Sequence, residues 1–80
     1  MTDVADAEID AAIMSELGPL SLKTVMVICC VGEKFGDTSS SFLDRIAGRI
    51  ATLIEAGNVQ VIGNLANWRR SEIWLTPPGK

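Results

Sequence analysis

Few residues of this 80-residue chain have side chains that could perform catalysis. The sequence contains no histidine and no tyrosine, which removes histidine general bases, Ser-His-Asp triads and histidine metal sites together. Its two cysteines, Cys29 and Cys30, are adjacent and lack the C-x-x-C spacing of zinc and redox sites. We therefore expect a protein that is not an enzyme and needs no metal or cofactor.

The arginines are the first candidates for a binding role. Arg45 and Arg49 lie one helical turn apart, and a nucleic-acid interface would add the polar and basic residues Ser40, Ser41, Arg69 and Arg70. The alternative is a solvated helix face on which these arginines pair with nearby carboxylates. Net charge favours this alternative, because the chain carries −3 overall and every charged side chain among its first 16 residues is acidic.

Aromatic residues near the C-terminus are the second candidates. Ile62, Trp68, Arg70 and Trp74 combine the residue types that are enriched at the centres of protein interfaces. The alternative is that one or both tryptophans pack into the core, since tryptophan buries a large area in small domains.

The first half of the chain is expected to form two helices. Residues 5–17 place their apolar side chains at helical spacing, and Gly18-Pro19 ends that segment. Ser21 is a candidate cap for a second helix that runs to about Lys34 and stops at Gly36. Its middle, residues 25–31, is apolar on every side, so we expect a helix that is buried nearly all round, with inert thiols of which at least one is shielded. A buried strand is the alternative for this run.

The second half is expected to form a third helix and a hairpin. Ser41, with Asp44 three residues on, approximates a capping box, and the apolar stripe that follows ends at Gly57. The period then changes to two, which predicts a strand over residues 59–62, a loop over 63–67 and a return strand over 69–75. In the return strand, Ser71, Ile73 and Leu75 should face one side and Trp74 the other.

Two segments carry a resemblance to a known superfamily. Leu53-Ile-Glu-Ala-Gly-Asn-Val59 is similar to the end of the recognition helix in bacterial winged helix-turn-helix regulators, and Gly63-Asn-Leu-Ala-Asn-Trp-Arg-Arg-Ser-Glu-Ile73 looks like the end of small bacterial domains of this shape. The resemblance covers about residues 5–75. It implies an α+β fold of three helices followed by a C-terminal β-hairpin. The start of the third helix departs from the pattern, because it carries serines and Asp44 where DNA-reading proteins carry positive charge.

These observations lead to two functional hypotheses. The first is a single winged-helix-like domain, residues 1–80, that acts as a protein interaction or assembly module and pairs with a protein partner or with itself as a homodimer. The rival is a DNA-binding transcriptional regulator that uses the third helix and the hairpin loop. The longest unbroken apolar run, residues 25–31, is too short to cross a bilayer, and the acidic N-terminus is unlike a signal peptide. We therefore expect a cytoplasmic protein without membrane contact.

Overall fold

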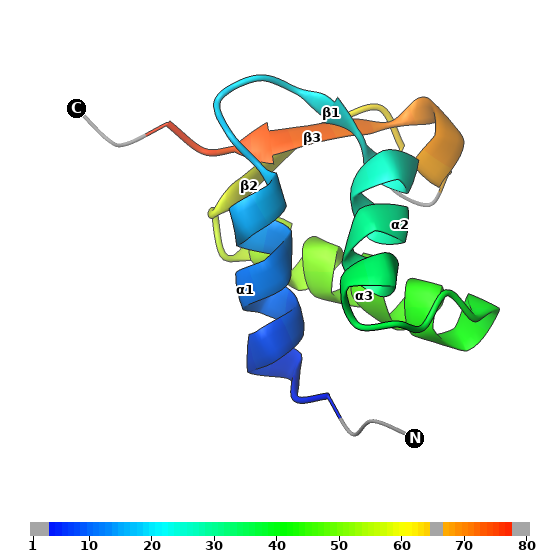
Figure 1. Cartoon of the computed structure of the whole chain (residues 1–80). Coiled ribbons are helices and arrows are strands. Elements are labelled where there is room, and N and C mark those ends of the chain that lie inside the picture. Colours follow the sequence, from blue (N-terminus) through cyan, green and yellow to red (C-terminus); the bar gives the residue numbers. More distant parts are fainter. Residues whose placement is uncertain (1–3, 65–66, 78–80) are drawn as a thin grey trace.

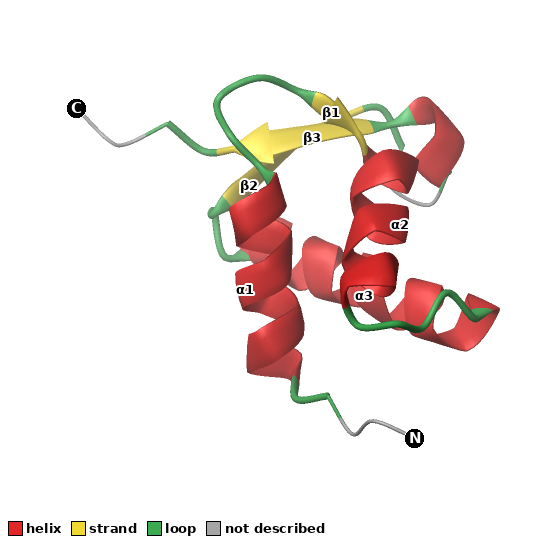
Figure 2. Ribbon diagram, viewed as in Figure 1, coloured by secondary structure: helices red, strands yellow, loops and turns green. Residues whose placement is uncertain are grey.

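The computed structural model describes residues 4–64 and 67–77 and has an α+β architecture, as predicted (Figures 1 and 2). The order of its elements is α1 (Asp6–Glu16), β1 (Leu22–Lys23), α2 (Thr24–Lys34), α3 (Ser40–Glu55), β2 (Val59–Ile62), a short 3₁₀ turn η1 (Trp68–Arg70) and β3 (Glu72–Leu75). The sheet lies across the upper ends of α1 and α2 in Figure 1, and α3 passes behind the lower part of α2.

Local sequence signals account for the ends of α2 and α3. Gly36 and Gly57 follow these helices with φ of 71° and 88°, a left-handed conformation that glycine adopts without steric cost. The backbone N–H groups of Asp37 and Asn58 then donate to the carbonyls of Gly32 and Leu53, at 2.9 and 3.0 Å. Both glycine stops are thus confirmed.

The start of α3 differs from the prediction by two residues. Ser39, not Ser41, is the cap, and its Oγ accepts a hydrogen bond from the N–H of Phe42 at 3.4 Å. Three consecutive serines offer the same capping chemistry. In the helix that Ser39 caps, Phe42 and Ile46 are buried in the core.

The sheet has three strands rather than the two of the expected hairpin. Its order is β1-β3-β2, and both pairs are antiparallel. Ile73 of the central strand β3 lies between Leu22 of β1 and Val61 of β2. The strand between α1 and α2 was not predicted, and the segment that Ser21 was expected to cap begins instead at Thr24. The return strand is shorter than predicted, because residues 68–70 form η1 and β3 begins at Glu72.

A buried hydroxyl pair joins the start of α2 to the start of β3. Ser71 Oγ donates to Thr24 Oγ1 at 2.8 Å, and the N–H of Thr24 donates to the carbonyl of Ser71 at 3.1 Å. Both side chains are almost completely excluded from solvent. Because a buried hydroxyl without a partner is costly, these bonds help to fix β1 beside β3.

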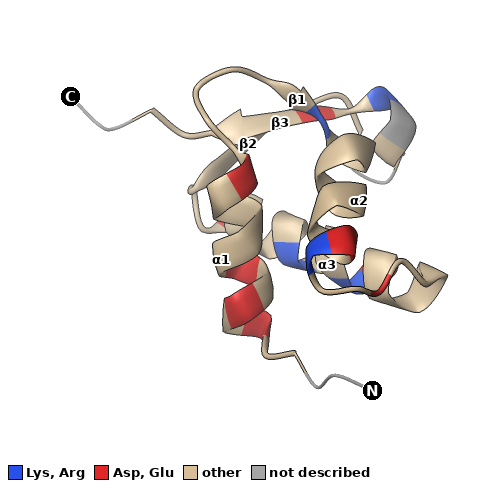
Figure 3. Ribbon diagram, viewed as in Figure 1, with Lys and Arg blue, Asp and Glu red and all other residues tan. Residues whose placement is uncertain are grey.

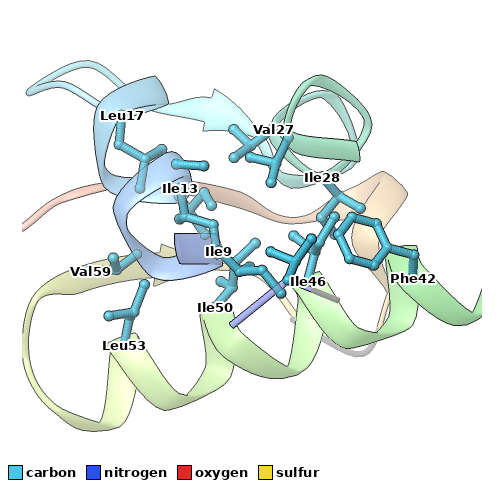
Figure 4. Packing of buried hydrophobic residues seen from close by; sticks show 14 residues of the cluster. Ile9, Ile13, Leu17, Val27, Ile28, Phe42, Ile46, Ile50, Leu53 and Val59 are labelled. Atoms are coloured by element: carbon cyan, nitrogen blue, oxygen red, sulfur yellow. The ribbon is translucent and has the colours of Figure 1, made fainter. Parts of the chain in front are cut away.

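The core lies between the three helices and the inner side of the sheet. Figure 4 shows Ile9 and Ile13 of α1 packed towards Val27 and Ile28 of α2 and towards Ile46 and Ile50 of α3. Val59 and Ile73 close it from the sheet side. This is the arrangement that the apolar stripes of α1 and α3 predicted.

The helical prediction for residues 25–31 is confirmed, whereas its all-round burial is wrong. Val27, Ile28 and Val31 are buried, but Met26 is 50% exposed, Cys29 is exposed and Cys30 is half-buried. Within the described residues α2 packs against α1, α3, η1 and β1, whereas the side that carries Met26 and Cys29 meets solvent. Both cysteines are free thiols. Cys29 is therefore not shielded, and half-buried Cys30 meets only in part the expectation that at least one thiol is shielded.

Within the described ranges, 4–64 and 67–77, none of the helices combines the length and hydrophobicity needed to cross a membrane.

Candidate interaction surface

The two sides of the hairpin strands differ as their alternating sequence predicts. Ser71 and Ile73 are buried, and Leu75 packs against the core. Glu72 and Trp74 therefore lie on the opposite side of β3. The outer sheet face, as we call this side, is formed by the outward residues of all three strands: Lys23, Gln60, Ile62, Glu72 and Trp74.

An apolar hollow lies at the border of the outer sheet face. It has a volume of about 320 Å³ and is lined by Pro19, Leu20, Ser21, Ile62, Glu72 and Trp74. Leu20 and Ile62 are 79% and 61% exposed, which is unusual for such large aliphatic side chains in so small a domain. The hollow thus combines a concave shape with apolar side chains that the described residues, 4–64 and 67–77, leave exposed.

The segment after α1 brings Leu20 to this position. α1 ends at Glu16, Leu17 is extended, and the carbonyl of Gly18 then accepts a hydrogen bond from the N–H of Leu75 at 3.0 Å. This bond holds the loop beside the end of β3. Leu20 is therefore held next to the sheet by backbone contacts while its own side chain stays in solvent.

Polar groups along the hollow and the strands are held by short side-chain hydrogen bonds. Ser21 Oγ donates to Glu72 Oε1 at 2.9 Å, and Gln60 Nε2 donates to Thr76 Oγ1 at the same distance. Lys23 lies directly opposite Glu72 in the register of β1 and β3. The face therefore carries one positive and one negative side chain near an apolar centre, the pattern of an interface core with a polar rim.

The structure brings together two of the four predicted interface residues. Ile62 and Trp74 line the same hollow. Trp68 lies in η1, is half-buried and packs against the core, so it is not part of the outer sheet face. Arg70 is exposed in η1 and does not line the hollow. The expected shared face is wrong for Trp68 because the 3₁₀ turn interrupts the strand alternation on which it was based.

Sequence reasoning missed Leu20 altogether. Its one signal is that this leucine sits between Pro19 and Ser21, outside every apolar stripe of the predicted helices. A large aliphatic residue in a turn has no partner within its own element. Only the position of β3 shows that it stands beside Ile62 and Trp74.

The arginines that were candidates for nucleic-acid contact are paired with carboxylates of α1. Arg45 Nη2 lies 2.8 Å from Asp6 Oδ1 and also donates to the carbonyl of Val4. Arg49 binds Asp10 through two parallel hydrogen bonds of 2.9 and 2.8 Å. Figure 3 shows the acidic residues of α1 and the basic residues of α3. Arg45 and Arg49 therefore follow the alternative expectation, in which these arginines pair with nearby carboxylates.

These contacts shift the protonation equilibria of the groups involved. The hydrogen bond from Arg45, with the nearby charge of Arg49, holds the pKa of Asp6 below its usual value of 3.8. The hydrogen bond to Asp10 raises the pKa of Arg49. Each shift favours the charged form of its own group, the carboxylate of Asp6 and the guanidinium of Arg49.

The solvent side of α3 has no surplus of positive charge. Its exposed residues include Ser40, Ser41, Asp44, Gly48, Thr52 and Glu55, and Arg45 is the one exposed cation of this helix. Arg70 lies in η1, which packs on α2, whereas Arg45 and Arg49 face α1. The side chain of Arg69 lies outside what the structure describes. The described arginines are therefore divided between two places and do not form one basic stripe.

Comparisons with protein-family models, with curated proteins and with solved structures found no match to this chain.

Proposed function

We propose that this protein is a non-catalytic interaction module that binds another protein chain through the hollow and the adjoining outer sheet face. The observation that carries the proposal is the exposure of Leu20 and Ile62 on either side of Trp74. Apolar patches of this kind, rimmed by polar side chains, mark protein interaction sites on small soluble domains. A partner would remove these residues from water and gain the corresponding hydrophobic free energy.

The proposal includes a winged-helix-like architecture and a cytoplasmic location. Three helices with an antiparallel hairpin after α3 support the first, and β1 adds a third strand to that hairpin. The two free thiols support the second, since a reducing compartment keeps cysteines in this state.

The rival proposal, a DNA-binding regulator, receives less support from the charge distribution. Phosphate binding requires cations that are available to release counterions. Arg45 and Arg49 are committed to Asp6 and Asp10, and the exposed side of α3 also carries Asp44 and Glu55. We therefore expect no submicromolar binding to duplex DNA at physiological salt. A fluorescence titration that finds such affinity, with a steep loss as salt rises, would favour the rival.

In-cell photo-crosslinking tests the interaction proposal. A photoreactive amino acid is placed at Ile62, and at Thr52 on the solvent side of α3 as a matched exposed control. We expect a cross-linked species of defined mass from position 62 only, and its loss when Leu20→Ser is added. No product from position 62, or equal products from both positions, would contradict the proposal.

A further inference from the structure

Resting on the proposed function, we infer that the partner of the outer sheet face is a second copy of this chain, related to the first by a two-fold axis. In such an isologous interface each copy offers the same patch, so the patch must contain both a projecting group and a space to receive it. Leu20 is the projecting group, because it is 79% exposed. The hollow of about 320 Å³, which Leu20 itself helps to line, is the receiving space for the leucine of the other copy.

The charges of the patch are also compatible with pairing to itself. Lys23 and Glu72 lie opposite each other on neighbouring strands, so the face carries balanced charge. A two-fold rotation can place Lys23 of one copy near Glu72 of the other without bringing an excess of like charges together.

The exposed side of α1 is a poorer surface for self-association. Among the described residues, the exposed large hydrophobic side chains are Leu20, Met26 and Ile62, and none of them lies on this helix. Its carboxylates Asp6, Asp10 and Glu16 are already paired with cations of the same chain. The lack of exposed apolar side chains therefore makes α1 less suited than the outer sheet face as the surface between copies.

The area required for a stable dimer explains why Leu20 must take part. A specific dimer buries at least about 1,000 Å² in total, or roughly 500 Å² from each copy, and this chain exposes 4969 Å². The three strands, of two, four and four residues, present at most roughly 160 Å² in projection. The strands alone are insufficient, so the loop of Pro19, Leu20 and Ser21 has to supply much of the remaining contact.

Sedimentation equilibrium of the full chain, from micromolar to the highest soluble concentration, tests the inference. We expect a species of twice the 8.6 kDa chain mass. Leu20→Ser should weaken the dimer roughly a hundredfold or more, because each dimer loses two buried leucines. Met26→Ser is the matched control: it removes a half-exposed apolar side chain from α2, outside the patch, and should leave the dimer unchanged.

A fluorescence measurement checks that the association uses this face. The variant Trp68→Phe leaves Trp74, which lines the hollow, as the only indole. Its emission should move to shorter wavelength as concentration rises, and Leu20→Ser should abolish that shift. Circular dichroism checks that each variant is folded, which is expected for Leu20→Ser because the side chain lies in solvent.

Three results would overturn the inference: a monomer at every concentration, a dimer that Leu20→Ser leaves intact, or a dimer whose Trp74 emission does not change. If the chain is monomeric while photo-crosslinking from position 62 still captures a different protein, the second copy is ruled out and the interaction module stands. If neither association nor cross-linking occurs, both proposals fail.

Discussion

The contact between α1 and α3 and the outer sheet face use similar residue types with opposite results. At the contact, isoleucines from both helices are completely buried and arginines at its border are held by carboxylates. On the outer sheet face, Ile62 and Leu20 are mostly exposed. The same aliphatic chemistry therefore stabilises the fold in one region and remains available for binding in the other. What distinguishes the regions is whether an opposing element of the same chain covers them.

The largest effect should come from comparing two isoleucines. Ile46→Ala should destabilise the domain by about 2–5 kcal/mol, because it leaves a cavity where the side chain is fully buried. Ile62→Ala should change the stability of the monomer by less than about 0.5 kcal/mol, since that side chain is 61% exposed. Urea unfolding at low protein concentration measures both values. Equal losses would mean that the outer sheet face belongs to the core.

Two helical glycines, Gly32 and Gly48, also differ in whether another part of the chain covers them. A Cβ at Gly32 would lie 2.9 Å from the carbonyl oxygen of Asp37 and from Leu43 Cδ2, so Gly32→Ala should destabilise the domain by about 1–3 kcal/mol. A Cβ at Gly48 meets nothing within 4 Å, so Gly48→Ala should stabilise α3 by up to about 1 kcal/mol. Thermal unfolding should give a lower melting temperature for Gly32→Ala and a higher one for Gly48→Ala. Destabilisation by Gly48→Ala would show that another element approaches α3 at this residue.

The ion pairs at the border of the contact should be coupled in a double-mutant cycle. Asp10→Asn and Arg49→Gln should each lower the urea midpoint, and the double variant should lose less than the sum, because each single change leaves the other group without its charged partner. Asp44→Asn, on the exposed side of α3, serves as the control and should have little effect. Strict additivity would show that the pair contributes nothing to folding.

The smallest effect should be a pH dependence at Asp6. The pKa of this group is lowered in the folded state by the hydrogen bond from Arg45, so its stabilising contribution is present above the unfolded pKa and is lost as pH falls through the folded pKa. Wild type should therefore exceed Asp6→Asn in stability at neutral pH, and the two should converge below the usual carboxyl pKa of 3.8. Urea midpoints of both proteins, measured from neutral pH to below 3.8, show whether their stabilities converge. A constant difference down to the lowest pH would exclude the ion pair as the cause.

Much of the local structure follows from the sequence by itself. Gly36 and Gly57 end α2 and α3, because left-handed backbone after a helix favours glycine. The alternation in β3 placed Ser71 and Ile73 inward, because successive strand side chains point to opposite sides. These features depend on residues a few positions apart, so short-range patterns suffice to predict them.

Only the tertiary structure determines which residues form the candidate site and which partners the arginines have. β1 has two residues and exists because it pairs with β3, about fifty residues later in the chain, so no local pattern signals it. Trp68 lies off the expected face because residues 68–70 form η1, and Cys29 is exposed because no described element covers that side of α2. Arg45 and Arg49 met Asp6 and Asp10 only when α1 packed on α3. For β1 and for the two arginines the contact joins residues distant in sequence, and its free energy depends on an element whose position the local sequence does not specify.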